Sequence, residues 1–196
     1  SVAGAAKGSR YSIMITLGTG VGGGIILDGQ VYSGFNFAGA ELGHMVIVKD
    51  GKECGCGRKG CWEAYASATA LINMTKEAIR NEKPEFSYML NLCEDDINNV
   101  TGKTPFDAMM AGDPTGKAVV DEYISYLACG ITNVINIFQP DVLCIGGGVS
   151  KQGDNLLNPV RAIVEAERIT KHNEKQTYIC AATLDNDAGI IGAAML

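Results

Sequence analysis

The chain has 196 residues, of which 46% are hydrophobic and 19% charged, a balance that excludes a disordered protein. A length of this size fits one sizeable domain whose core needs no disulfide support. The formal net charge of −6 provides no basic field, so nucleic acid and anionic lipid are not expected as direct partners. No apolar run is long enough to cross a bilayer, and the N-terminal residues lack the core of a signal peptide. We therefore expect a soluble, cytoplasmic protein.

The first half of the chain predicts short strands around a glycine-rich loop. Residues 11–17 are apolar and partly β-branched, which is typical of a buried strand, and the glycine run 18–24 follows. The pair Asp28-Gly29 stands between two apolar runs and favours a type I′ hairpin turn. Residues 45–48 predict a further short strand. Together these features indicate a hairpin-like first half.

Helices are expected to dominate the rest of the chain. Good helix formers with an apolar face predict a helix over 62–80, and the polar segment 81–100 predicts a helix-and-loop excursion. Later elements are bounded by proline or glycine. They are a helix over 113–138, a strand over 141–145, a helix opened by Asn158-Pro159, a strand over 177–184 and a final helix over 187–196. The alternation of strands and helices predicts an α/β domain with a mixed sheet covered by helices.

Three cysteines and a histidine lie close together in the sequence and suggest a metal site. His44, Cys54, Cys56 and Cys61 offer one imidazole and three thiols, which are the ligands that zinc prefers. Four protein ligands close a tetrahedron and imply a structural role for the ion. The alternative is a group of unliganded cysteines, but the segment is too polar and glycine-rich for a core. Exposed thiols at this density would also be prone to oxidation.

The remaining four cysteines stand singly in largely apolar stretches. They are Cys93, Cys129, Cys144 and Cys180. We expect them to be small core residues in a reducing compartment.

Two glycine loops are candidates for contact with a nucleotide. Residues 18–23 match the G-x-G-x-x-G pattern, but the predicted strand that follows disfavours a dinucleotide site, which needs a helix there. A loop of backbone N–H groups with the Thr19 hydroxyl can instead cradle phosphate oxygens. The second loop, 146–148, follows a buried strand and can lie against a base or ribose. A glycine-rich turn without a ligand is the alternative for the first loop, and three glycines alone are weak evidence for the second.

Two acidic residues flank the cysteine segment. Glu41 precedes His44 by three residues, and Glu63 follows Cys61 by two. Carboxylates and an imidazole beside a rigid loop can hydrogen-bond several hydroxyls, as a sugar site requires. The alternative is that both are solvated surface acids.

Five stretches of the chain resemble the ROK family of bacterial sugar kinases and repressors, and most closely its ATP-dependent glucokinases. They are LGTGVGGGIILDGQVYSG, FAGAELGHMVI, CGCGRKGCWEAYAS, INIFQPDVLCIGGGVS and DAGIIGAAML. The pattern E-x-x-H followed by C-x-C-G-x-x-G-C-x-E is the most specific of these features. The resemblance implies an actin- and hexokinase-like (ribonuclease H-like) fold of two lobes with ATP between them.

The resemblance also implies roles for individual residues. Sugar hydroxyls would be bound by Glu41, His44 and Glu63, phosphate by Thr19 and Gly20, and adenosine by Gly146 and Gly147. It further implies a structural Zn²⁺ on the four ligands named above, with ATP and Mg²⁺ as co-substrate. One ring nitrogen of His44 would bind the ion while the other faces the sugar.

Two family motifs are absent from the chain. They are an amino-terminal Asp-x-Gly-Gly-Thr and an Asn-Asp pair that carries the catalytic base. The resemblance therefore implies that residues 1–196 are the larger, carboxy-terminal lobe, with the catalytic aspartate upstream of Ser1 and the amino-terminal lobe absent. We expect no catalytic residue in this chain and no activity from it alone.

The function implied by the resemblance is phosphorylation of glucose at its 6-hydroxyl by ATP. One alternative is another hexose kinase of the family, a fructokinase or an N-acetylmannosamine kinase. The other is a sugar-responsive repressor, which would carry a helix-turn-helix ahead of this lobe. We also expect a homodimer, because family members are usually dimers and the helix over 114–138 has apolar residues to spare.

Overall fold

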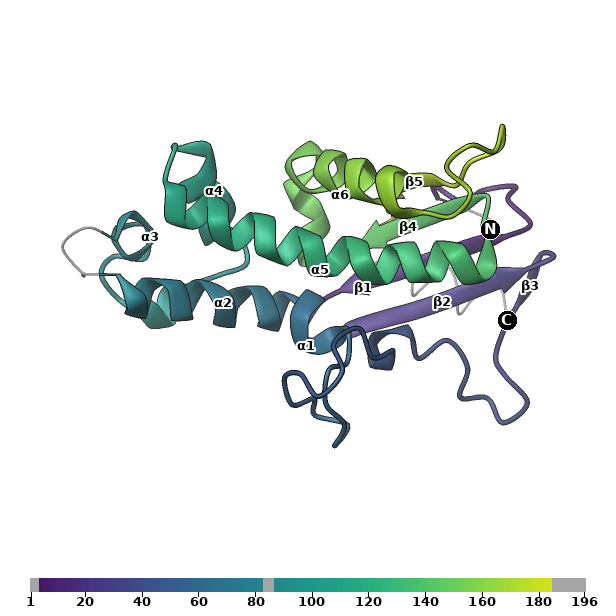
Figure 1. Cartoon of the computed structure of the whole chain (residues 1–196), viewed down its shortest axis with the longest axis horizontal. Coiled ribbons are helices and arrows are strands. Elements are labelled where there is room, and N and C mark those ends of the chain that lie inside the picture. Colours follow the sequence, from purple (N-terminus) through teal and green to yellow (C-terminus); the bar gives the residue numbers. More distant parts are fainter. Residues whose placement is uncertain (1–3, 83–86, 185–196) are drawn as a thin grey trace.

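The computed structural model describes residues 4–82 and 87–184, and a mixed sheet with helices packed on it forms its centre (Figure 1). The strands are β1 (Ser12–Leu17), β2 (Val21–Leu27), β3 (Gln30–Val31), β4 (Val142–Gly146) and β5 (Tyr178–Ala181). Their order across the sheet is β3-β2-β1-β4-β5. β1 pairs antiparallel with β2 and parallel with β4, and β4 pairs parallel with β5. The hairpin half and the parallel half of the chain therefore meet at β1.

The helices lie along the sheet and beyond its end. They are α1 (Glu63–Ala66), α2 (Ala68–Asn81), α3 (Tyr88–Asn91), α4 (Thr104–Met110), α5 (Pro114–Phe138) and α6 (Asp154–Glu167). Short 3₁₀ turns add η1 (Leu42–His44), η3 (Ile97–Asn99) and η4 (Gly148–Gln152). α5 runs along most of the molecule, with α6 on one side and the α1–α2 pair on the other (Figure 1). No helix of the described residues combines the length and hydropathy that crossing a membrane requires.

The prediction of one long helix ending at Phe138 is confirmed by α5. Asp113 caps its start by accepting a hydrogen bond from Gly116 N at 2.7 Å, and Pro114 occupies the first turn. Gln139 ends the helix in the left-handed conformation, with φ 44°. The apolar stripe of α5 is buried in the chain's own core. Ile137, near the end of the helix, is 65% exposed, but the buried stripe leaves α5 little apolar surface to spare for a dimer.

The predicted hairpin is confirmed, with a shorter loop before it than expected. Asp28 and Gly29 have φ values of 53° and 79°, as a type I′ turn requires. The connection from β1 to β2 is only 18–20, because the glycines at 22–24 belong to β2. A Cβ at Gly23 would lie 2.5 Å from the carbonyl oxygen of Ala40, so this strand needs glycine where the chain packs against it.

Two predictions around the cysteine segment need correction. The strand expected over 45–48 is wrong, since only Val46 forms an isolated bridge, with Cys61. The helix expected over 62–80 is divided into α1 and α2 at Ser67, whose ψ of 164° is extended. Ser67 Oγ accepts a hydrogen bond from Ala70 N at 3.0 Å and so caps α2. A capping serine thus begins a second helix in the middle of a stretch whose sequence pattern is helical throughout.

The second half departs from the predictions at its element boundaries. α6 begins at Asp154, four residues before the expected start, and Pro159 lies inside the helix. Within the segment 81–100 the structure describes α3 and η3. α4, which follows this segment, was not predicted, although Pro105 marks its first turn. β5 ends at Ala181, three residues before the end of the strand expected over 177–184. The final helix expected over 187–196 lies outside the described residues.

The single cysteines largely follow the prediction. Cys93, Cys144 and Cys180 are buried, whereas Cys129 is only partly so. Cys144 and Cys180 are register neighbours on β4 and β5 with sulfurs 3.7 Å apart, and burial raises the pKa of Cys144 to about 12. The Cys144 thiol is therefore protonated and unreactive at neutral pH.

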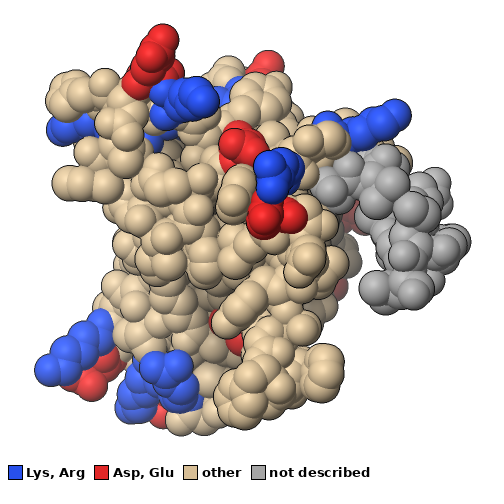
Figure 2. Space-filling model, turned by 90° about the vertical axis from the view of Figure 1, so that its right-hand side faces the viewer, with Lys and Arg blue, Asp and Glu red and all other residues tan. Residues whose placement is uncertain are grey.

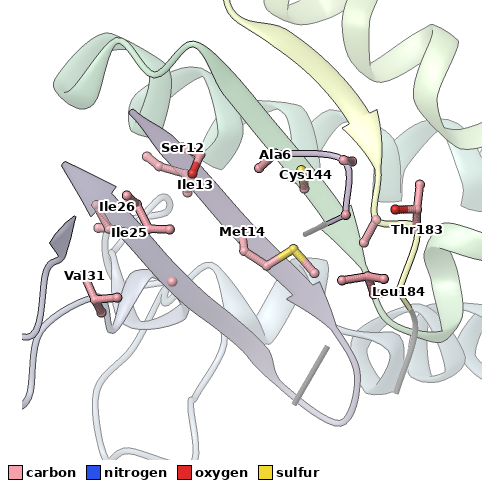
Figure 3. Close-up of a pocket in the computed structure, with 14 residues that line it drawn as sticks. Ala6, Ser12, Ile13, Met14, Ile25, Ile26, Val31, Cys144, Thr183 and Leu184 are labelled. Carbon is pink, nitrogen blue, oxygen red and sulfur yellow. The ribbon is translucent and has the colours of Figure 1, made fainter. Parts of the chain in front are cut away.

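An apolar hollow of about 300 Å³ lies on the sheet, away from the cysteine segment. Met14 and Cys144 point into it, with Thr183 and Leu184 at its side (Figure 3). Its lining is almost entirely apolar, so the polar chemistry of the chain lies elsewhere. At the β3 end of the molecule, Lys and Arg side chains stand beside Asp and Glu (Figure 2). The described residues of that face form no broad basic patch.

Candidate functional site

The four predicted metal ligands come together in one cluster. The ligand atoms of His44, Cys54, Cys56 and Cys61 all lie within 4.8 Å of one another. Cys54 Sγ is 3.6 Å from His44 Nδ1, and Cys56 Sγ is 3.7 Å from Cys61 Sγ. A tetrahedral zinc ion, with bonds of about 2.3 Å to sulfur and about 2.0 Å to nitrogen, holds two sulfurs about 3.8 Å apart and a sulfur and nitrogen about 3.5 Å apart. The cluster therefore has the spacing that such an ion requires.

A tight hairpin turns these thiols toward one point. Gly57 and Gly60 have φ values of 85° and 79°, and a Cβ at Gly60 would lie 1.7 Å from the carbonyl oxygen of Val48. Cys54 N donates to the carbonyl of Arg58 at 2.9 Å and closes the loop. Arg58 Nη1 donates to the carbonyl of His44 at 3.1 Å, which ties the loop to η1. Glycine at both turns is thus a condition for the cluster.

The pKa values of the thiols fit a site that is completed by a cation. Burial and the neighbouring sulfurs raise the pKa of Cys61 to about 12. A backbone hydrogen bond from Arg58 lowers the pKa of the exposed Cys56. Three sulfurs this close repel one another when ionised, so full ionisation needs a positive ion among them and would release protons on binding.

The acidic residues that flank the cysteine segment meet at this cluster. His44 turns Nδ1 toward Cys54, and its Nε2 lies 4.0 Å from Glu41 Oε2. On the other side, the Cys54 thiol lies 3.7 Å from Glu63 Oε1. Glu41, His44 and Glu63 are thus brought together, as a shared ligand site would need. Glu63 and His44 are partly buried, so the interpretation of both carboxylates as fully solvated acids fits Glu41 alone.

The glycine turn between β1 and β2 lies directly against Glu63. A Cβ at Gly20 would lie 2.1 Å from Glu63 Oε2, and Val21 N donates to the same oxygen at 3.1 Å. Among the described residues, no hydrogen bond uses the backbone N–H of Thr19 or of Gly20. The turn therefore presents two free N–H groups beside a carboxylate.

The second glycine loop lies next to the first one. β4 is the parallel neighbour of β1, and Gly146 is in register with Thr16. Gly147, with φ 89°, packs so closely that a Cβ there would lie 2.3 Å from the carbonyl oxygen of Leu17. Both loops therefore stand at the carboxyl ends of adjacent parallel strands, which is where open α/β sheets bind ligands. The sequence could not show this, because it does not reveal which strands are neighbours.

A pocket of about 270 Å³ joins the glycine turn to the cysteine loop. Its lining includes Thr19, Cys54 and Glu63, together with three polar residues from the start of α2. Those three are Ser67, Thr69 and Asn73, and the sequence reasoning missed them. Their signal was the spacing of Thr69 and Asn73, four residues apart on one helix face just after a capping serine.

Known proteins similar to this chain are sugar kinases and regulators. The profile of the ROK family matches residues 1–196. The glucokinase of Halalkalibacterium halodurans is 39% identical over 194 residues, which are 98% of this chain and 58% of that protein. The crystal structure of a ROK family glucokinase from Streptomyces griseus in complex with glucose and AMPPNP superposes with a TM-score of 0.88 at 34% identity. The superposition covers 97% of this chain and 61% of the Streptomyces griseus chain.

A regulator is also among the relatives. The xylose repressor of Bacillus subtilis is 27% identical over 195 residues, which are 100% of this chain and 46% of the repressor. The chain thus spans less than two thirds of the length of each of these relatives. The predicted mixed sheet with helices is confirmed as the actin/hexokinase-like fold of these kinases. Residues 1–196 belong to the ROK family.

Proposed function

We propose that the protein containing this chain transfers the γ-phosphate of ATP to the 6-hydroxyl of glucose. The observation that carries the proposal is the position of Glu63. Its carboxylate accepts a hydrogen bond from Val21 N at the end of the glycine turn and lies 3.7 Å from Cys54 Sγ. Glu41 and His44 lie at the same cysteine cluster. A group that binds hydroxyls and a group that binds phosphate are therefore adjacent. The glucokinase from Streptomyces griseus, crystallised with glucose and AMPPNP, supports this assignment.

In this proposal, Glu41, His44 and Glu63 bind the sugar hydroxyls that do not react. Carboxylates accept hydrogen bonds from hydroxyls, and each such bond to a charged group is stronger than a neutral one. Because His44 turns Nδ1 toward Cys54, its Nε2 remains for the sugar. The cysteine cluster would then set the direction of the imidazole ring.

The nucleotide takes the other side of the site. The free N–H groups of Thr19 and Gly20 would receive phosphate oxygens, and Gly146 and Gly147 would lie against the adenosine. Mg²⁺ that accompanies ATP would neutralise charge on the phosphates during transfer. Reaction then requires the 6-hydroxyl to lie in line with the γ-phosphate.

We also propose a structural zinc ion on His44, Cys54, Cys56 and Cys61. The spacing of the four ligand atoms supports it. Four protein ligands leave no open position, so the ion would hold the loop rather than take part in the reaction. Cys61 lies two residues before Glu63, the first residue of α1, so the ion would also anchor Glu63.

The general base is assigned outside residues 1–196. The relatives are longer than this chain, which matches 58% to 61% of the two glucokinases. We propose that this chain is the larger, carboxy-terminal lobe of such a kinase. An aspartate of the other lobe would then take the proton of the reacting hydroxyl.

We further propose that the protein is cytoplasmic and a homodimer. Since most apolar residues of α5 are buried, an interface would also need apolar residues from elsewhere in the chain. Phe35 and Phe37, in the loop after β3, are 99% and 88% exposed and support a contact of this kind. Sedimentation of the complete protein at micromolar concentration should give twice the mass of one chain, and a monomer alone would contradict the proposal.

A sugar-responsive repressor is the second candidate. The similarity of the whole chain to a xylose repressor favours it, since such a protein would use the same sugar site without phosphoryl transfer. Two measurements on the complete protein separate the candidates. A coupled assay should detect sugar phosphate from ATP and glucose, at a higher kcat/KM than with fructose or N-acetylmannosamine. Specific retardation of operator DNA without sugar phosphate would support the repressor instead.

A further inference from the structure

The segment that follows the cysteine cluster holds the glycine turn from outside. Ala68 N donates to the carbonyl of Gly18 at 2.9 Å. Thr69 Oγ1 donates to the carbonyl of Thr19, also at 2.9 Å. Both donors belong to the first turn of α2, which Ser67 starts as its cap. Two successive carbonyls of the turn are therefore held by two successive residues of one helix.

These carbonyls share peptide planes with the N–H groups that a phosphate would use. A peptide unit is planar and trans, so its C=O and N–H point in opposite directions. The carbonyl of Gly18 and the N–H of Thr19 form one unit, and the carbonyl of Thr19 and the N–H of Gly20 form the next. Anchoring the two oxygens on α2 therefore orients both N–H groups away from α2.

The contact from Thr69 is made by a side chain and can be changed without altering the backbone. Thr69 is exposed and lines the pocket beside Thr19. An exposed hydrogen bond between a hydroxyl and a carbonyl contributes little to the stability of the fold. Its removal should therefore affect the direction of the turn more than the folding of the chain.

We propose that Thr69 is a positioning residue for phosphoryl transfer, acting through the carbonyl of Thr19 to aim the N–H of Gly20 at a phosphate oxygen of ATP. The inference rests on the proposed function, because it takes the glycine turn to be the phosphate site. Thr69 itself need not touch the nucleotide. The bond from Ala68 orients the N–H of Thr19 in the same way.

The test compares isosteric variants in the complete protein. Thr69→Val removes the hydroxyl and should lower kcat/KM for ATP by about threefold to tenfold, with the KM for glucose unchanged. Thr69→Ser keeps the hydroxyl and should restore kcat/KM to within about twofold of the wild type. Thr75→Val is the matched control, because Thr75 Oγ1 donates to the carbonyl of Leu71 at 2.8 Å in the same helix, without reaching the turn. Its kinetics should be those of the wild type.

Calorimetric titration measures the affinity for AMPPNP without any reaction, so it tests the role of Thr69 separately from the proposed function. A wild type that makes no sugar phosphate contradicts the proposed function, and weaker AMPPNP binding by Thr69→Val would still support the role of Thr69. Equal AMPPNP affinity and equal kcat/KM for ATP in the two proteins would overturn that role. So would equal losses in Thr69→Val and Thr69→Ser, since the hydroxyl would then not matter. Should Thr69→Val not fold, Thr69→Ala provides the second variant without a hydroxyl.

Discussion

At the scale of single residues, Glu63 connects the parts of the site that the sequence shows separately. Its two carboxylate oxygens face different neighbours, one toward Val21 N and the other toward Cys54 Sγ. Gly20 leaves room for this arrangement because any side chain there would meet Glu63 Oε2. The glycine of the turn and the glutamate of α1 therefore depend on each other.

Replacement of Gly20 by alanine tests this dependence. The new Cβ would lie 2.1 Å from Glu63 Oε2, which is the terminal atom of a flexible side chain and can move. We expect Gly20→Ala to change the free energy of unfolding by less than about 1 kcal/mol, because only this carboxylate has to shift. The KM for glucose should rise by at least about threefold as the carboxylate leaves its place. Kinetics and urea unfolding of the complete protein measure both quantities.

Gly102→Ala is the control for Gly20→Ala, since the nearest atoms to a Cβ there are 3.8 Å away in ordinary contact. It should leave the KM for glucose unchanged. If Gly20→Ala also kept the wild-type KM, the packing of Glu63 on the turn would have no part in sugar binding.

At the scale of elements, the cysteine loop, α1 and α2 form one continuous support for the site. Cys61 belongs to the cluster, Glu63 opens α1, and Ser67 starts α2, which holds the glycine turn. Trp62 lies between them, fully buried, with its Nε1 donating to the carbonyl of Tyr126 on α5 at 3.0 Å. The cluster is thus connected to the longest helix of the core.

Loss of one cysteine ligand should disturb this support. We expect about one zinc ion per chain in the purified protein, because the site offers four ligands of the kind that zinc prefers. Cys56→Ser should lose the ion. It should also lower kcat/KM for glucose by at least about tenfold, because residues that orient the binding residues of a site commonly affect activity by that factor. Cys129→Ser, outside the cluster and only partly buried, should keep both. Elemental analysis beside the kinetics provides the readout, and a fully active wild type without metal would contradict the proposal.

The contact between α5 and Trp62 predicts a change in stability. A Cβ at Gly130 would lie 2.1 Å from Cε2 of the Trp62 ring, which is buried and cannot give way. We expect Gly130→Ala to lower the free energy of unfolding by about 1–3 kcal/mol, despite the better helix propensity of alanine. Thermal unfolding should show a melting temperature several degrees lower, whereas Ser125→Ala, at an exposed site of the same helix, should not differ from the wild type. An unchanged melting temperature in Gly130→Ala would show that the ring can move.

Local signals in the sequence were sufficient for some of these elements. The capped start of α5, the Asp28-Gly29 turn and the Cys/His cluster each depend on residues close together in the chain. The start of α6 was predicted too late because Asn158-Pro159 has the residues of a helix start, and the chain tolerates this proline inside the helix.

Other features depend on contacts between distant segments and could not be predicted from local signals. The neighbouring positions of β1 and β4, which bring the two glycine loops together, come from the sheet order. The hydrogen bonds from α2 to the turn likewise join Thr69 to Thr19 across 50 residues. Sequence patterns thus predicted the four residues that meet in the Cys/His cluster, but not the residue of α2 whose side chain bonds to the glycine turn.

At the scale of the whole molecule, the described chain carries groups suited to binding and none that we assign to proton transfer. The carboxylates of Glu41 and Glu63 lie beside the cysteine cluster. The proposal uses both for hydroxyls that do not react. We therefore propose that the general base lies outside residues 1–196, in keeping with the greater length of the relatives.

Residues 1–196 produced alone should therefore be nearly inactive. Absence of a general base costs about 10²–10⁴-fold in rate, and loss of part of the nucleotide site costs more through positioning. Formation of glucose-6-phosphate by this chain, assayed beside the complete protein, measures the difference. Comparable rates would show that the base lies within these residues.

The most direct test of the account is a matrix of initial rates for the complete protein, with glucose and ATP varied independently. Glu63→Gln should raise the KM for glucose by about tenfold or more, because a charged acceptor is lost. Its KM for ATP should stay within about twofold, because the amide oxygen can still accept from Val21 N. Thr19→Val should show the opposite result, with a change in the KM for ATP and little change in the KM for glucose. A Glu63→Gln protein with an unchanged KM for glucose would contradict the assignment of this cluster to the sugar.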